Sequence, residues 1–112
     1  MNSKKPNVCI DFDGVLNTYN GWQGENELFD VRVGCREFLE KLHEIYHVII
    51  FTTRDINIVT KWLKNNDLSE FIYSVTNEKP IALVYVDDRG INFSGDFDET
   101  YKNILKFKPY WK

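Results

Sequence analysis

The sequence predicts a three-layer α/β domain, in which a parallel sheet is covered by helices on both faces. Short apolar and β-branched runs such as Val48–Phe51 are typical of strands that are buried on both sides. These runs alternate with segments whose apolar residues recur at helical spacing, as Phe38 and Leu42 do. Strands that alternate with helices favour a parallel sheet.

The composition indicates one compact unit. The 112 residues suit a single domain over 1–112, and 43% hydrophobic residues are enough to build a core. A net charge of -3 argues against a protein whose main task is to wrap nucleic acid. Cys9 and Cys35 predict reduced core thiols of a cytoplasmic protein. Neither a signal peptide nor a membrane span is expected, because the apolar runs are too short.

The first third of the chain predicts a strand, a flap and a helix. The strand covers Val8–Asp11. Residues 17–30 contain the turn signals Asn20-Gly21 and Gly24, which predict a hairpin or flap. Gly34 opens a helix whose inward face is formed by Cys35, Phe38, Leu39, Leu42 and Tyr46.

The rest of the chain predicts three more strands and two helices. Asp55 is a suitable N-cap for the first of these helices, which ends at Asn65–Asp67. The other elements are strands at 48–51, near 71–75 and within 82–88, and a helix from about 98 to 106.

Polar side chains follow the predicted strands at one edge of the sheet, where parallel α/β proteins carry out their chemistry. Asp11 and Asp13 are two residues apart, so both lie on one face of the strand end and their repulsion must be offset. Acids favour a hard cation, whereas lysine and hydroxyl groups favour an anion, and Mg²⁺-assisted phosphoryl transfer requires both. The full set is Asp11, Asp13, Thr52, Thr53, Arg54, Lys79, Asp87, Asp88 and Arg89.

These residues resemble the motifs of the haloacid dehalogenase-like (HAD) superfamily of phosphohydrolases over essentially the whole chain. "DFDGVL" resembles the DxDG motif, and "VIIFT" resembles the second motif, which closes a strand with a hydroxyl residue. Lys79 in "NEKP" and the acids of "VYVDD" resemble the third and fourth motifs. The resemblance implies a Rossmann-like, HAD-like core. The segment before the first helix has room for a flap only, so no cap domain is expected.

The resemblance implies a Mg²⁺-dependent phosphomonoesterase that forms an aspartyl-phosphate. Asp11 would be the nucleophile, and Asp13 would act first as general acid and then as general base. Thr52 and Lys79 would hold the phosphoryl oxygens. The implied metal ligands are Asp11, the backbone carbonyl of Asp13, Asp87 and Asp88. The further candidates for contact with a phosphorylated substrate are Thr53, Arg54 and Arg89.

Some assignments have two readings. Thr53 rather than Thr52 could bind phosphate, and Arg54 and Arg89 could pair with local acids instead of phosphate. Trp22 could stack on a substrate ring or pack against its own domain. An idle phosphate-binding module, and a phosphotransferase to an acceptor other than water, are the alternative functions. The chain could oligomerise, but nothing in the sequence indicates that it does.

The first expectation for the substrate is a nucleotide or a nucleic-acid end. The run "VDDRGINF" resembles enzymes that process such ends, and the tail "YKNILKFKPYWK" interleaves lysines with aromatic residues. The tail also fits a helix with lysines facing water. A small phosphorylated metabolite is the next candidate.

Overall fold

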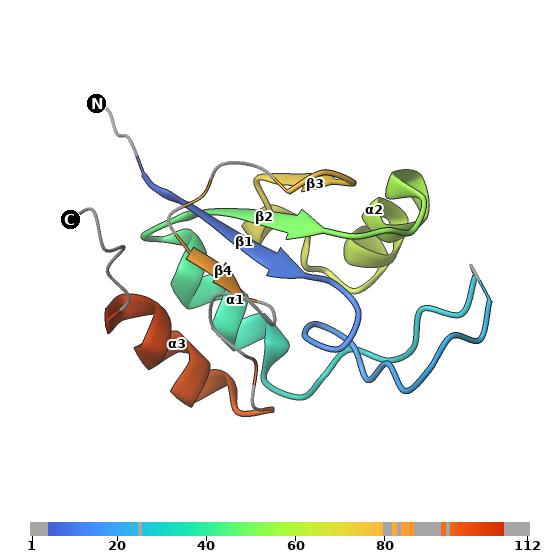
Figure 1. Ribbon diagram of the computed structural model, residues 1–112, viewed down its shortest axis with the longest axis horizontal. Coiled ribbons are helices and arrows are strands. Elements are labelled where there is room, and N and C mark those ends of the chain that lie inside the picture. The colour runs from blue at the N-terminus through green and yellow to red at the C-terminus, as the bar shows by residue number, and fades with distance from the viewer. Residues whose placement is uncertain are drawn as a thin grey trace.

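The parallel sheet is confirmed in the computed structural model, of which we describe residues 5–24, 26–79, 82, 84–86, 93 and 95–106. The order of the strands is β3-β2-β1-β4, and each neighbouring pair is parallel (Figure 1). The strands are β1 (Asn7–Asp11), β2 (His47–Phe51), β3 (Ser74–Thr76) and β4 (Val84–Val86). The chain is thus an α/β protein, and the described residues contain no cap domain.

A layer of helices packs on one face of this sheet. It contains α1 (Cys35–His43), α2 (Ile56–Asn65), the 3-10 turn η1 (Ser69–Phe71) and α3 (Phe97–Lys106). α1 lies behind β4 in Figure 1 and contacts β2, α3 and η1, while η1 also contacts α2. Buried residues of all three helices join one apolar core with Val8, Ile10, Val48 and Ile50 of the strands.

The other face of the sheet is covered as well. Cys9 and Ile49 alternate with the strand residues of the main core and therefore point to the opposite side. They are only 2% and 4% exposed. Both faces are buried, as we expected, but the helices that the structure describes all lie on one of them.

Local signals explain where the helices begin. Gly34 is the N-cap of α1 with a φ of 90°, and a Cβ at this position would lie 3.2 Å from the Phe97 ring. Glycine is therefore required there both by the backbone and by the packing. Asp55 caps α2 as predicted, because its Oδ1 accepts a hydrogen bond from the backbone N–H of Asn57 at 2.8 Å.

Two expected boundaries were wrong. Tyr46 is buried but lies beyond α1, which ends at His43, and its N–H donates to Leu42 O at 2.8 Å in the turn toward β2. Phe71 lies in η1 rather than in a strand, and β3 begins at Ser74. In both places an aromatic residue packs inward from a turn. Its apolar side chain therefore fitted the pattern of the neighbouring helix or strand, although it lies outside that element.

None of the helices in the described part of the chain has the length and apolarity that would be needed to cross a membrane.

Candidate active site

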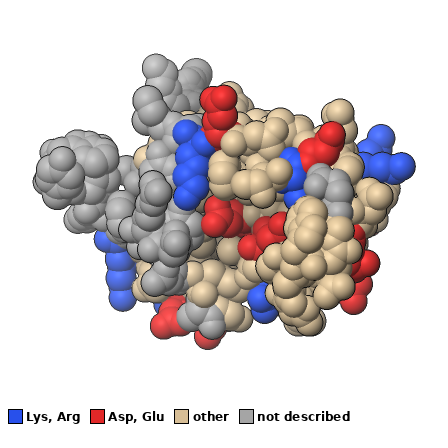
Figure 2. All heavy atoms as spheres, turned by 45° about the vertical axis from the view of Figure 1, so that its right-hand side comes forward, with Lys and Arg blue, Asp and Glu red and all other residues tan. Residues whose placement is uncertain are grey.

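The strand register aligns the carboxyl ends of β1, β2 and β3 at the same edge of the sheet. Asp11 at the end of β1 pairs with Phe51 of β2, and Phe51 pairs with Thr76 of β3. Beyond the pairs, Phe12 N donates to Phe51 O and Thr52 N donates to Thr76 O, each at 3.0 Å. Figure 2 turns this edge toward the viewer and shows acidic side chains near the centre of the face, with basic ones on either side.

A small cavity opens at this edge between the ends of β1 and β2. Its volume is about 160 Å³, and its lining consists of Asp11, Phe12, Asp13, Phe51, Thr52 and Thr53. Four of the predicted site residues are thus brought together. A larger hollow of about 640 Å³ shares none of these lining residues. It lies between α1 and α3, and its lining includes Glu37, Asp96 and Asp98 but no hydroxyl residue and no residue from a strand end. We therefore place the candidate site at the smaller cavity.

Asp13 is held by two donors. Arg54 Nε donates to Asp13 Oδ2 at 2.9 Å, and Asn17 Nδ2 donates to Asp13 Oδ1 at 2.9 Å. The Arg54 side chain is fully buried, whereas 24% of the Asp13 side chain is exposed. The arginine offsets the repulsion expected between Asp11 and Asp13. Of the two roles open for Arg54, the structure shows pairing with a local acid.

The two threonines after β2 differ in burial. Thr52 is 3% exposed, and its Oγ1 accepts a hydrogen bond from Arg54 N at 2.9 Å. This contact orients the hydroxyl and leaves its proton available for donation. Thr53 is exposed beside the same cavity. Of the two hydroxyls, that of Thr52 is therefore the buried and oriented one.

Lys79 also lies at this edge. Its Nζ is 5.3 Å from the ring centroid of Phe51, which lines the cavity. A lysine at that place supplies positive charge next to the acids and hydroxyl groups. Asp87, Asp88 and Arg89 lie outside the described residues, and β4 ends at Val86, which pairs with Ile10.

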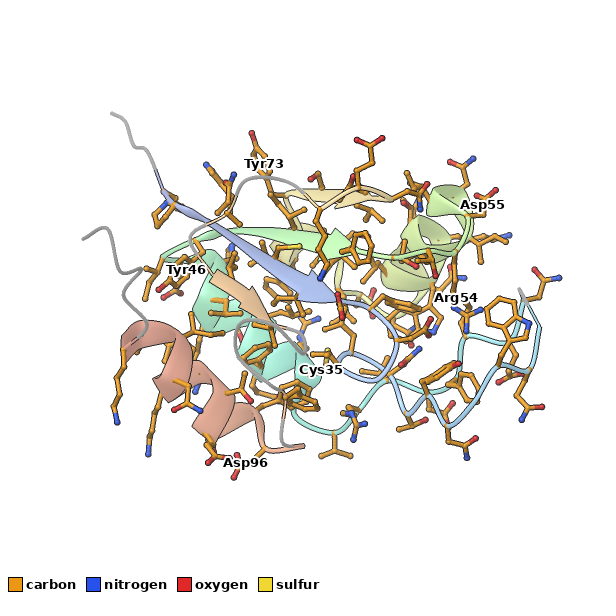
Figure 3. The ribbon with its side chains drawn as sticks, in the orientation of Figure 1. Cys35, Tyr46, Arg54, Asp55, Tyr73 and Asp96 are labelled. Atoms are coloured by element: carbon orange, nitrogen blue, oxygen red, sulfur yellow. The ribbon has the colours of Figure 1, made fainter. Side chains whose placement is uncertain are left out.

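The flap forms a loop that is closed by an isolated antiparallel bridge between Asn17 and Val31. Arg54 connects its interior to the site: Nη1 donates to Gly24 O at 3.2 Å, and Cζ lies 4.8 Å from the ring centroid of Trp22. Figure 3 shows Arg54 between the end of β2 and the flap. One buried arginine therefore contacts both Asp13 and the flap.

The sequence analysis missed two asparagines that organise the site. Asn17 is fully buried, and besides Asp13 it donates to Leu28 O at 2.9 Å and accepts from Gly14 N at 2.9 Å. Asn77 Nδ2 donates to Thr52 O at 2.8 Å and to Arg54 O at 2.9 Å, which fixes the loop after β2. Asparagine is common in turns, so neither residue carried a distinctive signal.

The donor set at the cavity suits a hard cation. Carboxylate and backbone carbonyl oxygens, which Asp11 and Asp13 supply here, are the ligands that Mg²⁺ prefers. No cluster of three or more metal-binding side chains occurs within the described residues. Two of the four acids that we assigned to the metal, Asp87 and Asp88, are not among those residues.

The parallel sheet, the DxDG turn after β1 and the hydroxyl residue after β2 define a HAD-like phosphatase fold. The sequence matches the family described as NLI interacting factor-like phosphatase over residues 4–79. The chain belongs to this family. The matched region contains Asp11, Asp13, Thr52 and Lys79 and ends before the acidic pair Asp87-Asp88.

A solved structure supports the fold independently. The chain is similar to a conserved protein from Bacteroides thetaiotaomicron, with a TM-score of 0.70 and 18% sequence identity over 96% of each chain. This likeness concerns the fold alone. No curated protein sequence matches the chain.

Proposed function

We propose that this protein is a Mg²⁺-dependent phosphomonoesterase that works through an aspartyl-phosphate on Asp11. The observation that carries the proposal is the cavity that Asp11, Asp13 and Thr52 share, with the Lys79 ammonium close to its Phe51 wall. Membership of a phosphatase family supports the same reaction class. The buried thiols of Cys9 and Cys35 fit the cytoplasmic location that we infer.

In the first step, a carboxylate oxygen of Asp11 attacks phosphorus, and the bond between phosphorus and the leaving oxygen breaks. The leaving oxygen takes a proton from Asp13, and the hydroxyl of Thr52 and the ammonium of Lys79 stabilise the charge on the phosphoryl oxygens. In the structure both Asp13 oxygens accept hydrogen bonds. When Asp13 carries the proton that it donates, one of these oxygens becomes a hydroxyl and accepts more weakly from its partner, Asn17 or Arg54.

In the second step, water attacks the phosphorus of the aspartyl-phosphate and gives its proton to Asp13. The bond between phosphorus and Asp11 breaks and inorganic phosphate leaves. The hydrogen bonds of Asp13 suit this step. Arg54 and Asn17 donate to its two oxygens, which favours the carboxylate form that accepts a proton from water.

The metal would be held by the Asp11 carboxylate and the Asp13 carbonyl, together with Asp87 and Asp88. Its contribution when bound is to neutralise phosphate charge and to offset the repulsion among the acids.

The decisive experiment measures phosphate release from an aryl phosphate and a panel of nucleotides and sugar phosphates, with Mg²⁺ or with EDTA. Wild type is compared with Asp11→Asn. Asp98→Asn is the matched control, because Asp98 is exposed on α3 and pairs only loosely with Lys41 at 3.6 Å.

We expect release that needs the metal, disappears in Asp11→Asn and persists in Asp98→Asn. A covalently phosphorylated wild-type intermediate should be trapped by rapid acid quench and detected by mass spectrometry. Equal release by wild type and a folded Asp11→Asn would overturn the assignment of the nucleophile. No release from any substrate by metal-loaded wild type would overturn the proposed hydrolase activity.

A further inference from the structure

Trp22 is an exposed aromatic residue in a fixed position. The Arg54 guanidinium carbon lies 4.8 Å from its ring centroid, so the arginine covers one face of the indole. Even so, 58% of the Trp22 surface is exposed. A tryptophan that only stabilised its own flap would gain more by burying that surface, at about 25 cal/mol per Å². This tryptophan is instead held in place with apolar surface left open to solvent.

The position of Trp22 relative to the chemistry follows from its contacts. Arg54 holds Asp13 through Nε at 2.9 Å and Trp22 through the next atom, Cζ, at 4.8 Å. These two distances and one C–N bond place the indole centroid at most about 9 Å from Asp13 Oδ2, a gap that a sugar can span. In the proposed reaction Asp13 serves the leaving oxygen, so the group attached to that oxygen lies near Asp13, which Arg54 connects to the flap.

The position of the flap is itself fixed around this residue. Arg54 Nη1 donates to Gly24 O at 3.2 Å, two positions after Trp22. The neck of the flap, where its two ends meet, is closed by the bridge between Asn17 and Val31. Trp62 Nε1 in α2 donates to Phe29 O at 3.1 Å and ties the second half of the flap to the core. A ring that stacks on Trp22 would therefore meet a surface whose position is already set, so little ordering is required on binding.

We propose that Trp22, held by Arg54, is the leaving-group subsite of this enzyme and selects phosphomonoesters with a flat ring beyond a sugar-sized spacer, namely nucleoside monophosphates. The open indole surface stacks on the base, while phosphate occupies the cavity at Asp11 and Thr52. This inference rests on the proposed function, because it takes Asp13 as the group beside the leaving oxygen.

The kinetic test compares a nucleoside monophosphate with glycerol phosphate, which has no ring, in wild type, Trp22→Phe and Trp22→Leu. Tyr73→Leu is the matched control, because Tyr73 is a 64% exposed aromatic residue that does not line the candidate site. In Trp22→Leu, kcat/KM for the nucleotide should fall about 10-fold more than kcat/KM for glycerol phosphate, and Trp22→Phe should restore most of the difference. Tyr73→Leu should leave the ratio of the two substrates unchanged.

A binding test separates this inference from the proposed function because it needs no turnover. In the Asp11→Asn background, binding of the nucleoside monophosphate and of glycerol phosphate is measured by calorimetry with Mg²⁺, with and without Trp22→Leu. The leucine should weaken binding of the nucleotide about 10-fold more than binding of glycerol phosphate.

Three results would overturn the subsite. The first is an equal loss for both ligands, which is the signature of a structural role for Trp22. The second is no loss for either ligand, and the third is no nucleotide binding at all. If wild type releases no phosphate from any ester, the hydrolase proposal fails, and the binding comparison still decides whether Trp22 is a ring-binding surface.

Discussion

Arg54 Nε donates a hydrogen bond of 2.9 Å to Asp13 Oδ2, although the two residues are 41 positions apart in the sequence. This pair joins the first two motifs of the site. The guanidinium is fully buried and also reaches the flap at Gly24. A lysine could not make both contacts in this geometry, because it lacks the planar fork of donors. The pair therefore couples the position of a proposed proton-transfer group to the position of the flap.

Replacing Arg54 by methionine should destabilise the fold by about 2 kcal/mol, because the change removes charged hydrogen bonds and leaves Asp13 facing an apolar side chain. Urea unfolding monitored by circular dichroism would measure the loss. The control is Arg36→Met, which removes an ion pair with Glu70 between side chains that are 46% and 65% exposed, a hydrogen bond to Asp67 O and a contact with the Phe71 ring. Because Arg36 lies at the surface, that change should cost less than Arg54→Met, about 1 kcal/mol. Equal losses in the two variants would contradict the role given to Arg54.

Asn17→Ala should cost about 2 kcal/mol, since four hydrogen bonds converge on this fully buried side chain. The neck of the flap should also open more often. Hydrogen exchange should then become faster at Thr18 N–H and Arg32 N–H, which donate to Asp30 O and Leu16 O at 2.9 Å. Asn57→Ala, an exposed position in α2, is the control and should leave these two amides protected. Unchanged exchange in Asn17→Ala would show that the neck does not depend on this side chain.

Thr52→Val should lower kcat/KM by about 100-fold, the usual effect of removing one donor to a developing negative charge. Thr53→Val should have a much smaller effect, because Thr53 is exposed, whereas the Thr52 hydroxyl is buried and oriented by Arg54 N. Thr52→Ser keeps the hydroxyl and should recover most of the activity. Steady-state kinetics on the best substrate would compare the three variants. A larger loss in Thr53→Val than in Thr52→Val would transfer the phosphate-binding role to Thr53.

Cys35 should resist alkylation in the folded protein. Burial, followed by the charge of Glu37, raises the pKa of its thiol from 9.0 to about 12. At pH 8 the thiol is neutral and enclosed, so iodoacetamide should modify it only when the chain is unfolded in urea, as peptide mass spectrometry would show. Rapid modification of Cys35 in buffer would contradict the burial.

The same shift in pKa links the stability of the fold to pH. Between pH 9 and 12 the unfolded chain loses the thiol proton of Cys35 while the folded chain retains it. The contribution of this group is therefore complete below pH 9 and decreases as the pH rises toward 12. Cys35→Ala should remove this part of the alkaline loss of stability, which urea titrations across that range would reveal.

The strands and caps were predictable wherever the signal was local. The predicted strand Val48–Phe51 matches β2, which begins one residue earlier, at His47. Asp55 caps α2 as predicted. Both signals act on neighbouring residues, so they can be recognised in the sequence. Phe71 was wrongly predicted to lie in a strand, since its ring packs against His43 and under Arg36 from a 3-10 turn. A short apolar run does not distinguish a strand from a turn that packs inward.

The site was predictable in outline but not in its internal contacts. The carboxyl-edge rule placed Asp11, Asp13 and Thr52 together, and they line one cavity. The pairing of Arg54 with Asp13, and the clamp of Asn77 on the backbone at Thr52 and Arg54, depend on side-chain directions that only the packed structure fixes. The sequence left both roles of Arg54 open for that reason.

The bridge between Asn17 and Val31 has a consequence for how the protein can change over time. Because the two ends of the flap are joined beside Asp13, residues added near the tip at Gly21 would lengthen the loop without spreading its base. Additions at Gly21 that keep the contacts of Arg54 with Trp22 and Gly24 would therefore also keep the hydrogen bond between Arg54 and Asp13. A designer could lengthen the flap at that point to alter substrate range and leave the spacing of Asp11, Asp13 and Thr52 as it is.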